Sequence, residues 1–244
     1  MKVLIPIFTV LIFIFSSSSL SAQDIKNYDE EKYYSWFDKQ VGLENTSINN
    51  GIRYKELYRV KNNKHKFYKN PSFIIGDIIY DDQPYFNIEM KYDLFDDQII
   101  VNLTQETGKS MFQLIKEKVN YFTLDNRNFI NIFEKKVNNS SNYLNGFYEI
   151  LIKNETLILY KKHKKIRIKQ LENSIVYSEF KDSNEFYIFS NNDYNIIKSK
   201  VDLIRVFPNY KKEINSFYKD NRILLKSDYD LFLINASKYL NNLY

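Results

Sequence analysis

A strict alternation of apolar and polar residues constrains the fold of this chain more than any other feature. Phe86, Ile88, Met90 and Tyr92 alternate with Asn, Glu and Lys, so the four apolar side chains would share one face of an extended segment. A period of two residues with one apolar face is the signature of a half-buried β-strand. The middle of the chain is therefore expected to form an antiparallel sheet.

Turn signals follow one another about every 8 to 12 residues along this part of the chain, which is typical of all-β folds. Residues 81–84 and 96–97 separate apolar runs, so residues 73–103 are expected to form an antiparallel meander of three strands. Residues 125–128 and 153–155 each lie between two runs rich in β-branched and aromatic residues, and they predict two further hairpins.

The last fifth of the chain changes to a helical period. Tyr210, Ile214, Phe217 and Tyr218 would form one apolar stripe on a helix that follows Pro208. Proline suits the first turn of a helix, where its missing N–H costs nothing. The stripes of this tail are short, and we expect them to pack on the sheet.

Local signals also predict where several helices begin. Ser199 is placed to cap the first tail helix, and Ser227 with Asp230 resembles a capping box that precedes the last one. Residues 110–118 carry apolar side chains at helical spacing, so a short helix is expected there.

We therefore predict a β-rich α+β fold, with an antiparallel meander that is sandwich-like or partly closed and with C-terminal helices packed on it. Residues 1–22 are interpreted as a signal peptide and residues 23–50 as an irregular lead-in. Residues 51–197 are expected to form the β body, and residues 198–244 a helical tail of the same domain.

The N-terminus has the pattern of an export signal. Lys2 is followed by an apolar run over residues 3–15, and small residues over 16–22 precede Gln23. A membrane-spanning helix needs about 20 apolar residues, and this run is shorter. We expect cleavage after Ala22 and an exported mature protein, periplasmic or associated with the outer membrane, with no transmembrane segment.

Cysteine and histidine usage narrows the chemistry. The chain has no Cys and only two His, which excludes disulfides, thiolate metal sites and a cysteine nucleophile and leaves little room for a zinc site. We predict no cofactor and no metal. Export without cysteines favours a bacterial envelope, since secreted eukaryotic proteins of this size usually carry disulfides. The net charge of +5 is small, and with export it argues against a nucleic-acid partner.

A basic run is the most prominent charge feature. It could be a solvated strand edge, where lysines block edge-to-edge pairing, or it could contact anionic envelope lipid or polysaccharide. His163 inside it is interpreted as part of a solvated basic turn. The candidate binding residues of the run are Lys161, Lys162, His163, Lys164, Lys165, Arg167 and Lys169.

Carboxylates gather around the predicted meander turns, at Asp81, Asp82, Asp93, Asp96 and Asp97. Asp forms turns through its own backbone hydrogen bonds, which accounts for such a cluster. Calcium binding and a glycosidase pair are the alternatives, because both chemistries use carboxylate oxygens.

Four segments resemble exported proteins of unassigned function from Bacteroidota-type bacteria. They are residues 50–54, residues 63–68, the stretch Tyr80-Asp81-Asp82-Gln83-Pro84-Tyr85, and the tail from Lys198 to Asn221. The resemblance implies an envelope location and a β-rich body with a helical tail. It brings no catalytic residues.

Three functions remain open. The leading hypothesis is a non-enzymatic envelope protein that binds a protein or an anionic envelope partner through the basic run or the tail stripe. The second is a periplasmic carrier of lipid or another hydrophobic ligand, with the tail helices as a lid over a curved sheet. The third is a carbohydrate hydrolase that uses Asp93 or Asp97.

Overall fold

The computed structural model describes residues 28–105 and 108–243, so the predicted signal peptide lies outside the described residues. Strands account for 45% and helices for 28% of the structure, which confirms the β-rich class with C-terminal helices. An antiparallel sheet of 11 strands runs through the body, and it is not closed. No helix in the described ranges is long and apolar enough to cross a membrane.

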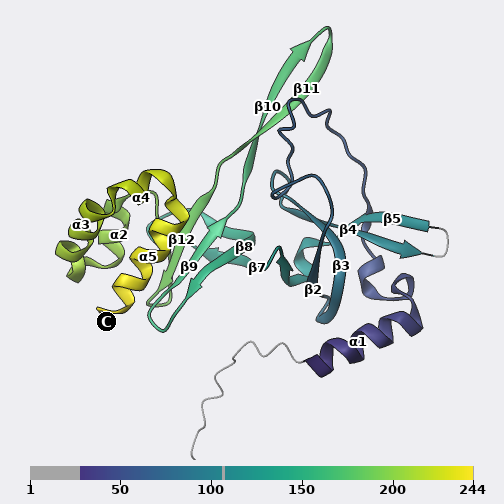
Figure 1. Ribbon diagram of the computed structural model, residues 1–244, viewed down its shortest axis with the longest axis horizontal. Coiled ribbons are helices and arrows are strands. Elements are labelled where there is room, and N and C mark those ends of the chain that lie inside the picture. Colours follow the sequence, from purple (N-terminus) through teal and green to yellow (C-terminus); the bar gives the residue numbers. More distant parts are fainter. Residues whose placement is uncertain (1–27, 106–107, 244) are drawn as a thin grey trace, which may run out of the picture.

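The large sheet spans the body from α1 to the helical tail (Figure 1). Most neighbouring strands are consecutive in the chain, except at three places where strands further apart in the sequence pair. In spatial order the strands are β1 (Ile52–Arg53), β5 (Gly108–Gln113), β4 (Gln98–Gln105), β3 (Gln83–Asp93), β2 (Ile74–Tyr80), β6 (Val119–Leu124), β7 (Arg127–Lys136), β8 (Tyr143–Lys153), β9 (Ile158–Lys162), β12 (Glu185–Ser190) and β13 (Asp193–Ile196). The remaining strands, β10 (Lys165–Glu172) and β11 (Ile175–Asp182), form a separate antiparallel ribbon that projects from the body as an arm (Figure 1), and Ser178 of β11 also bridges to Val60.

The predicted alternation in β3 holds only from Ile88 onward. Ile88, Met90 and Tyr92 are buried, but Phe86 is half-buried and Tyr85 is buried in its place. The pairing with β2 shifts register in this stretch, where Asn87 has a φ of 56°. Such a bulge adds a residue to one strand and moves the following side chains to the other face.

Four hairpin turns consist of two successive residues with positive φ and contain no glycine. This is the backbone of a type I′ turn, whose twist matches that of the flanking strands. Asn and Asp tolerate the left-handed region better than other non-glycine residues, which explains their use here. The turns are Asp81-Asp82, Asp125-Asn126, Asn173-Ser174 and Asn191-Asn192.

Two expectations about local structure are wrong. Residues 110–118 do not form a helix, because 110–113 lie in β5, which pairs with β4, and only Lys116–Lys118 form a 3-10 turn. From Tyr28 onward the lead-in is regular: α1 (Tyr28–Val41) is followed by the 3-10 turns Leu43–Asn45 and Ser47–Asn49. Burial of Ile48 in the core, with no side-chain surface exposed, holds this segment in place.

The tail forms a helical layer at one end of the molecule (Figure 1). Its helices pack on side chains of β8, β9 and β12 in a shared core, as predicted. Ser199 caps the first helix by accepting a hydrogen bond from the amide of Asp202. The last helix is capped by Asp228 rather than Ser227, which is the final residue of the helix before it. The tail consists of α2 (Lys200–Val206), the 3-10 turn Pro208–Tyr210, α3 (Lys211–Asp220), α4 (Arg222–Ser227) and α5 (Tyr229–Asn241).

Candidate functional site

The basic run lies where β9 leaves the large sheet and the chain enters the β10–β11 arm. Side chains of an extended segment alternate between two sides. Accordingly, Lys161, His163 and Lys165 line one cavity, and Lys162 and Lys164 line another. The run therefore separates two cavities instead of forming one basic surface.

The first cavity, here called the histidine cavity, has a volume of about 480 Å³ and lies between the sheet and α5. At its wall Nε2 of His163 is 2.5 Å from Oε2 of Glu149, and both residues are buried. The ring edge of Tyr68 packs on the imidazole at a centroid distance of 5.0 Å. Burial lowers the pKa of His163, although Glu149 acts in the opposite direction, so the neutral imidazole is favoured.

The charges around this cavity are paired. Lys161 forms an ion pair with Asp230 of α5, and the guanidinium of Arg127 is 3.5 Å from Glu149. Lys165 donates hydrogen bonds to the backbone carbonyls of His65 and Phe67. The Lys161–Asp230 pair ties the sheet to the tail.

The second cavity is larger, at about 570 Å³, and is here called the tyrosine cleft. It combines aromatic rings, carboxylates, ammonium groups and the polar loop before β8. Its main lining residues are Phe95, Asp97, Tyr143, Asn145, Tyr148, Lys162, Lys164, Glu185 and Tyr187.

The floor of the tyrosine cleft is a half-buried carboxylate with three donors. The hydroxyl of Tyr92 and the ammonium groups of Lys116 and Lys162 are each 2.7 Å from an oxygen of Asp97. Burial opposes ionisation of Asp97, but the two ammonium groups outweigh it and hold the pKa of the carboxyl below its ordinary value. Asp97 is thus a fixed anion with its charge already compensated.

The rim of the tyrosine cleft is accessible. The side chain of Lys164 is 48% exposed, and its ammonium is 3.6 Å from Glu185. The hydroxyl of Tyr187 donates to Glu185 at 2.7 Å. Tyr143 is 57% exposed, which leaves more than half of this side chain in contact with solvent.

The expected solvated basic turn around His163 is wrong, because three consecutive basic side chains of this segment are buried against carboxylates. Lys161, Lys162 and His163 are buried against Asp230, Asp97 and Glu149 respectively. Desolvating a cation is tolerated only when an opposite charge or a hydrogen bond replaces water.

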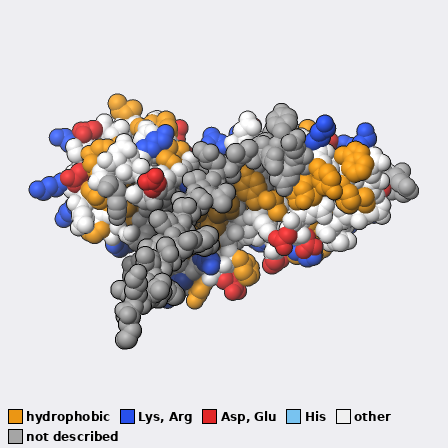
Figure 2. Space-filling model, turned by 90° about the horizontal axis from the view of Figure 1, so that it is seen from below, with side chains coloured by type: hydrophobic (Ala, Val, Ile, Leu, Met, Phe, Trp, Pro, Cys, Tyr) orange, Lys and Arg blue, Asp and Glu red, His pale blue; other side chains and the backbone are white. Residues whose placement is uncertain are grey.

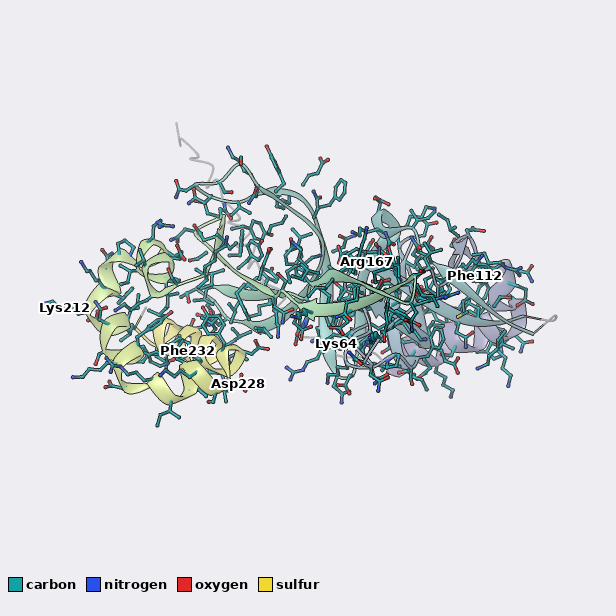
Figure 3. The ribbon with its side chains drawn as sticks, turned by 90° about the horizontal axis from the view of Figure 1, so that it is seen from above. Lys64, Phe112, Arg167, Lys212, Asp228 and Phe232 are labelled. Atoms are coloured by element: carbon teal, nitrogen blue, oxygen red, sulfur yellow. The ribbon has the colours of Figure 1, made fainter. Side chains whose placement is uncertain are left out.

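The remaining members of the run lie on the arm. Arg167 donates to the hydroxyl of Ser178, and its guanidinium stacks on the ring of Tyr58 at 4.3 Å. Lys169 is exposed. Arg167 lies where the arm meets the body, close to Lys64, whose ammonium is 2.7 Å from Glu179 of β11 (Figure 3).

The predicted tail stripe faces inward. Ile214 is 1% exposed, and Tyr210, Phe217 and Tyr218 are half-buried members of the tail core. The rings of Phe217 and Tyr218 pack on Phe232 of α5 at 5.4 and 4.8 Å, so these candidate binding residues form an internal contact. The labelled Phe232 lies within the helical layer (Figure 3).

The clustered carboxylates have different structural roles. Asp81 and Asp82 form a type I′ turn, as expected for turn chemistry. Asp93 is buried 2.7 Å from the ammonium of Lys66 and does not line either cavity, whereas Asp97 lines the tyrosine cleft. The two candidate catalytic carboxylates are therefore held by different lysines.

A patch of apolar side chains is exposed on α1 at the opposite end of the molecule from the tail (Figure 2). Tyr33 is 63% exposed and Trp36 59% exposed. Sequence reasoning had not assigned this segment an element, so the patch went unnoticed.

Sequence reasoning also missed Tyr143, Glu149, Glu185 and Asp230. Two of them lie opposite lysines on neighbouring strands, where opposite charges are favoured: Glu149 pairs with Lys161 across β8 and β9, and Glu185 pairs with Lys162 across β12 and β9. The hairpin predicted at 153–155 could have pointed to Glu149. Tyr143 and Asp230 reach their places through contacts between more distant segments.

Within the described ranges, no group of three or more His, Cys, Asp or Glu side chains could hold a metal ion. Comparisons of this chain with protein-family models, with curated proteins and with solved structures give no match.

Proposed function

We propose that this protein is exported to the cell envelope and acts by binding a ligand in the tyrosine cleft. The observation that carries the proposal is the cleft itself, where an exposed aromatic ring and an exposed ammonium group stand above a floor whose charges are already paired. A concave site with a few convergent polar groups is the usual form of a small-ligand site.

Export is supported by the pattern of residues 1–22, which has a basic start, an apolar run and small residues before Gln23. The resemblance to exported envelope proteins points the same way. N-terminal sequencing of the protein from its own cells should begin at Gln23, and a retained Met1 would contradict the proposal.

Binding is favoured over glycoside hydrolysis by the state of Asp97. A glycosidase needs one carboxyl group that keeps its proton near neutral pH. The lysines beside Asp97 lower its pKa, and the second carboxylate of the cleft, Glu185, accepts a hydrogen bond from Tyr187. The state of Asp97 therefore does not favour a protonated acid.

The lining of the cavities also bears on the hydrophobic-carrier hypothesis. Charged side chains line both of them, including the histidine cavity between the sheet and α5. Elsewhere the tail packs on the sheet through buried apolar side chains such as Leu159 and Phe232. An apolar ligand would have to displace paired charges, which is costly.

The proposal is tested by thermal unfolding of the purified protein with fractions of the envelope of its own organism, separated into polysaccharide, lipid and protein. A ligand that binds only the folded state raises the unfolding temperature. We expect one fraction to do so for the wild type and much less for Tyr143→Ala. Tyr33→Ala, which removes an exposed tyrosine on α1, is the control. Equal shifts for all three proteins, or no shift, would refute a ligand site in the cleft.

A further inference from the structure

We infer that the tyrosine cleft takes an uncharged oligosaccharide, with a sugar ring placed against Tyr143. This inference rests on the proposed function and names the ligand class for the same site. It differs from the expectation of an anionic partner, which rested on the basic run.

The charge balance of the cleft argues for a neutral ligand. Asp97 and Glu185 oppose Lys162 and Lys164, so the formal charges of these lining residues cancel, and the ammonium of Lys116, which does not line the cleft, pairs with Asp97 at 2.7 Å. The more buried cation, Lys162, is 2.7 Å from Asp97. An anionic polymer would meet two carboxylates along with the lysines, and it would gain little from the site as a whole.

The aromatic rings suit the apolar face of a sugar. The C–H groups on one face of a pyranose carry a small positive charge and match the negative face of an aromatic ring. Tyr143 offers such a ring, since this residue is 57% exposed. Phe95 adds a second ring to the lining, and edge contacts with Tyr58 and Phe180 hold it in place.

The polar groups suit sugar hydroxyls, which both donate and accept hydrogen bonds. The Oδ1 of Asn145 accepts from the backbone amide of Glu134, which leaves the NH₂ group of this lining residue as a donor. Lys164 lies 3.6 Å from Glu185, a long contact that leaves its ammonium with N–H donors for a ligand. A mixture of donors and acceptors around an aromatic ring is what a polyhydroxylated ligand requires.

The cleft also has a suitable size and rigidity. Its volume of about 570 Å³ falls in the usual range for small-ligand sites. Its floor is fixed by the donors around Asp97, so little ordering would be needed on binding. A preformed site loses less conformational entropy when the ligand binds.

The test is isothermal titration calorimetry of the full mature protein with a panel of neutral α- and β-linked hexasaccharides of glucose, mannose and N-acetylglucosamine. An oligogalacturonate of equal length is the charged comparison. We expect at least one neutral hexasaccharide to bind, with an affinity that changes little between about 50 and about 300 mM salt. Tyr143→Ala should weaken binding by about tenfold or more, whereas Tyr143→Phe, which keeps the ring, should stay near the wild type.

Tyr33→Ala is the control for loss of an exposed tyrosine elsewhere and should bind as the wild type does. The inference is overturned if no neutral hexasaccharide binds, if only the oligogalacturonate binds, or if Tyr143→Ala binds as well as the wild type. Circular dichroism and unfolding curves establish that each variant is folded. If envelope fractions still stabilise the wild type through Tyr143, the proposed function survives and only the ligand class is wrong.

Discussion

The carboxylate of Asp97 packs against Gly146 so closely that a Cβ atom at Gly146 would lie 1.8 Å from Oδ2 of Asp97. The same Cβ would lie 2.9 Å from Nζ of Lys162. Gly146 has a φ of 99°, a conformation that other residues rarely adopt. The ion pair at the floor of the tyrosine cleft therefore depends on the absence of a side chain at Gly146 of β8.

Gly146→Ala is expected to destabilise the protein, because the new methyl group must displace Asp97 from its lysines. Gly108→Ala is a matched control: Gly108 also has a positive φ, of 113°, but a Cβ there would meet no atom within 4 Å. The control measures the backbone strain alone, about 1 to 2 kcal/mol. In urea unfolding, the free energy of unfolding of Gly146→Ala should be about 1 to 3 kcal/mol lower than that of Gly108→Ala. Equal losses of stability in the two variants would mean that Asp97 moves away from the new methyl group at no cost.

Asp97→Asn should be strongly destabilising, because it leaves the buried ammonium of Lys162 without a counter-charge. Removing one partner of a buried pair typically costs about 3 to 5 kcal/mol. Asp81→Asn is the control, since Asp81 pairs with Lys118 on the surface, where both side chains are about 40% exposed, and such pairs contribute less than about 1 kcal/mol. Similar unfolding free energies for the two variants would contradict a structural role for the cleft floor.

The stability of the protein should fall as the pH drops from about 7.5 to about 5.5, partly through His163. Burial lowers the pKa of His163 in the folded state, so in this window the unfolded chain binds a proton that the folded protein resists. The free energy of unfolding therefore rises with pH here. His163→Gln should show a smaller difference between the two pH values than the wild type.

His65 must be considered in the same experiment. Burial also lowers its pKa, so it contributes with the same sign. Both proteins retain His65, and the difference between their pH dependences isolates His163. Parallel curves over this range would show that the imidazole beside Glu149 is not held neutral.

The left-handed turn residues give a local prediction at the β12–β13 hairpin. Asn192 has a φ of 64° and is exposed. Asn192→Ala should cost about 1 kcal/mol, because a Cβ without a polar side chain is poorly tolerated there. Asn192→Gly should keep or raise the stability, since glycine is preferred at this place in a type I′ turn. If unfolding curves show that Asn192→Ala is more stable than Asn192→Gly, the assignment of the turn is contradicted.

Much of the fold was predictable because its signals are local. The hairpin turns at 125–128 and 153–155, the cap at Ser199 and the helical tail each follow from a few neighbouring residues. The errors arose where tertiary pairing overrides local pattern. Residues 110–113 carry a helical spacing, but β4 offers an edge to which they pair. The bulge at Asn87 changed which aromatic residue of β3 is buried.

The candidate site was far less predictable. The positions of Lys161, Lys162 and His163 were evident as a cluster of charge, but their counter-charges come from other strands and from α5, with Asp230 lying 69 residues after Lys161. The residues of a basic run do not show whether the run faces solvent or the interior, because its counter-charges lie elsewhere in the sequence.

The sequence by itself determined the period of most segments and most of the hairpin turns, because backbone preferences and side-chain alternation act over a few residues. Only the tertiary structure decided that Lys161, Lys162 and His163 are buried against carboxylates and that Tyr143 is exposed in the lining of a cleft. The free energy of a charge depends on its surroundings in space, and packing between distant segments sets those surroundings.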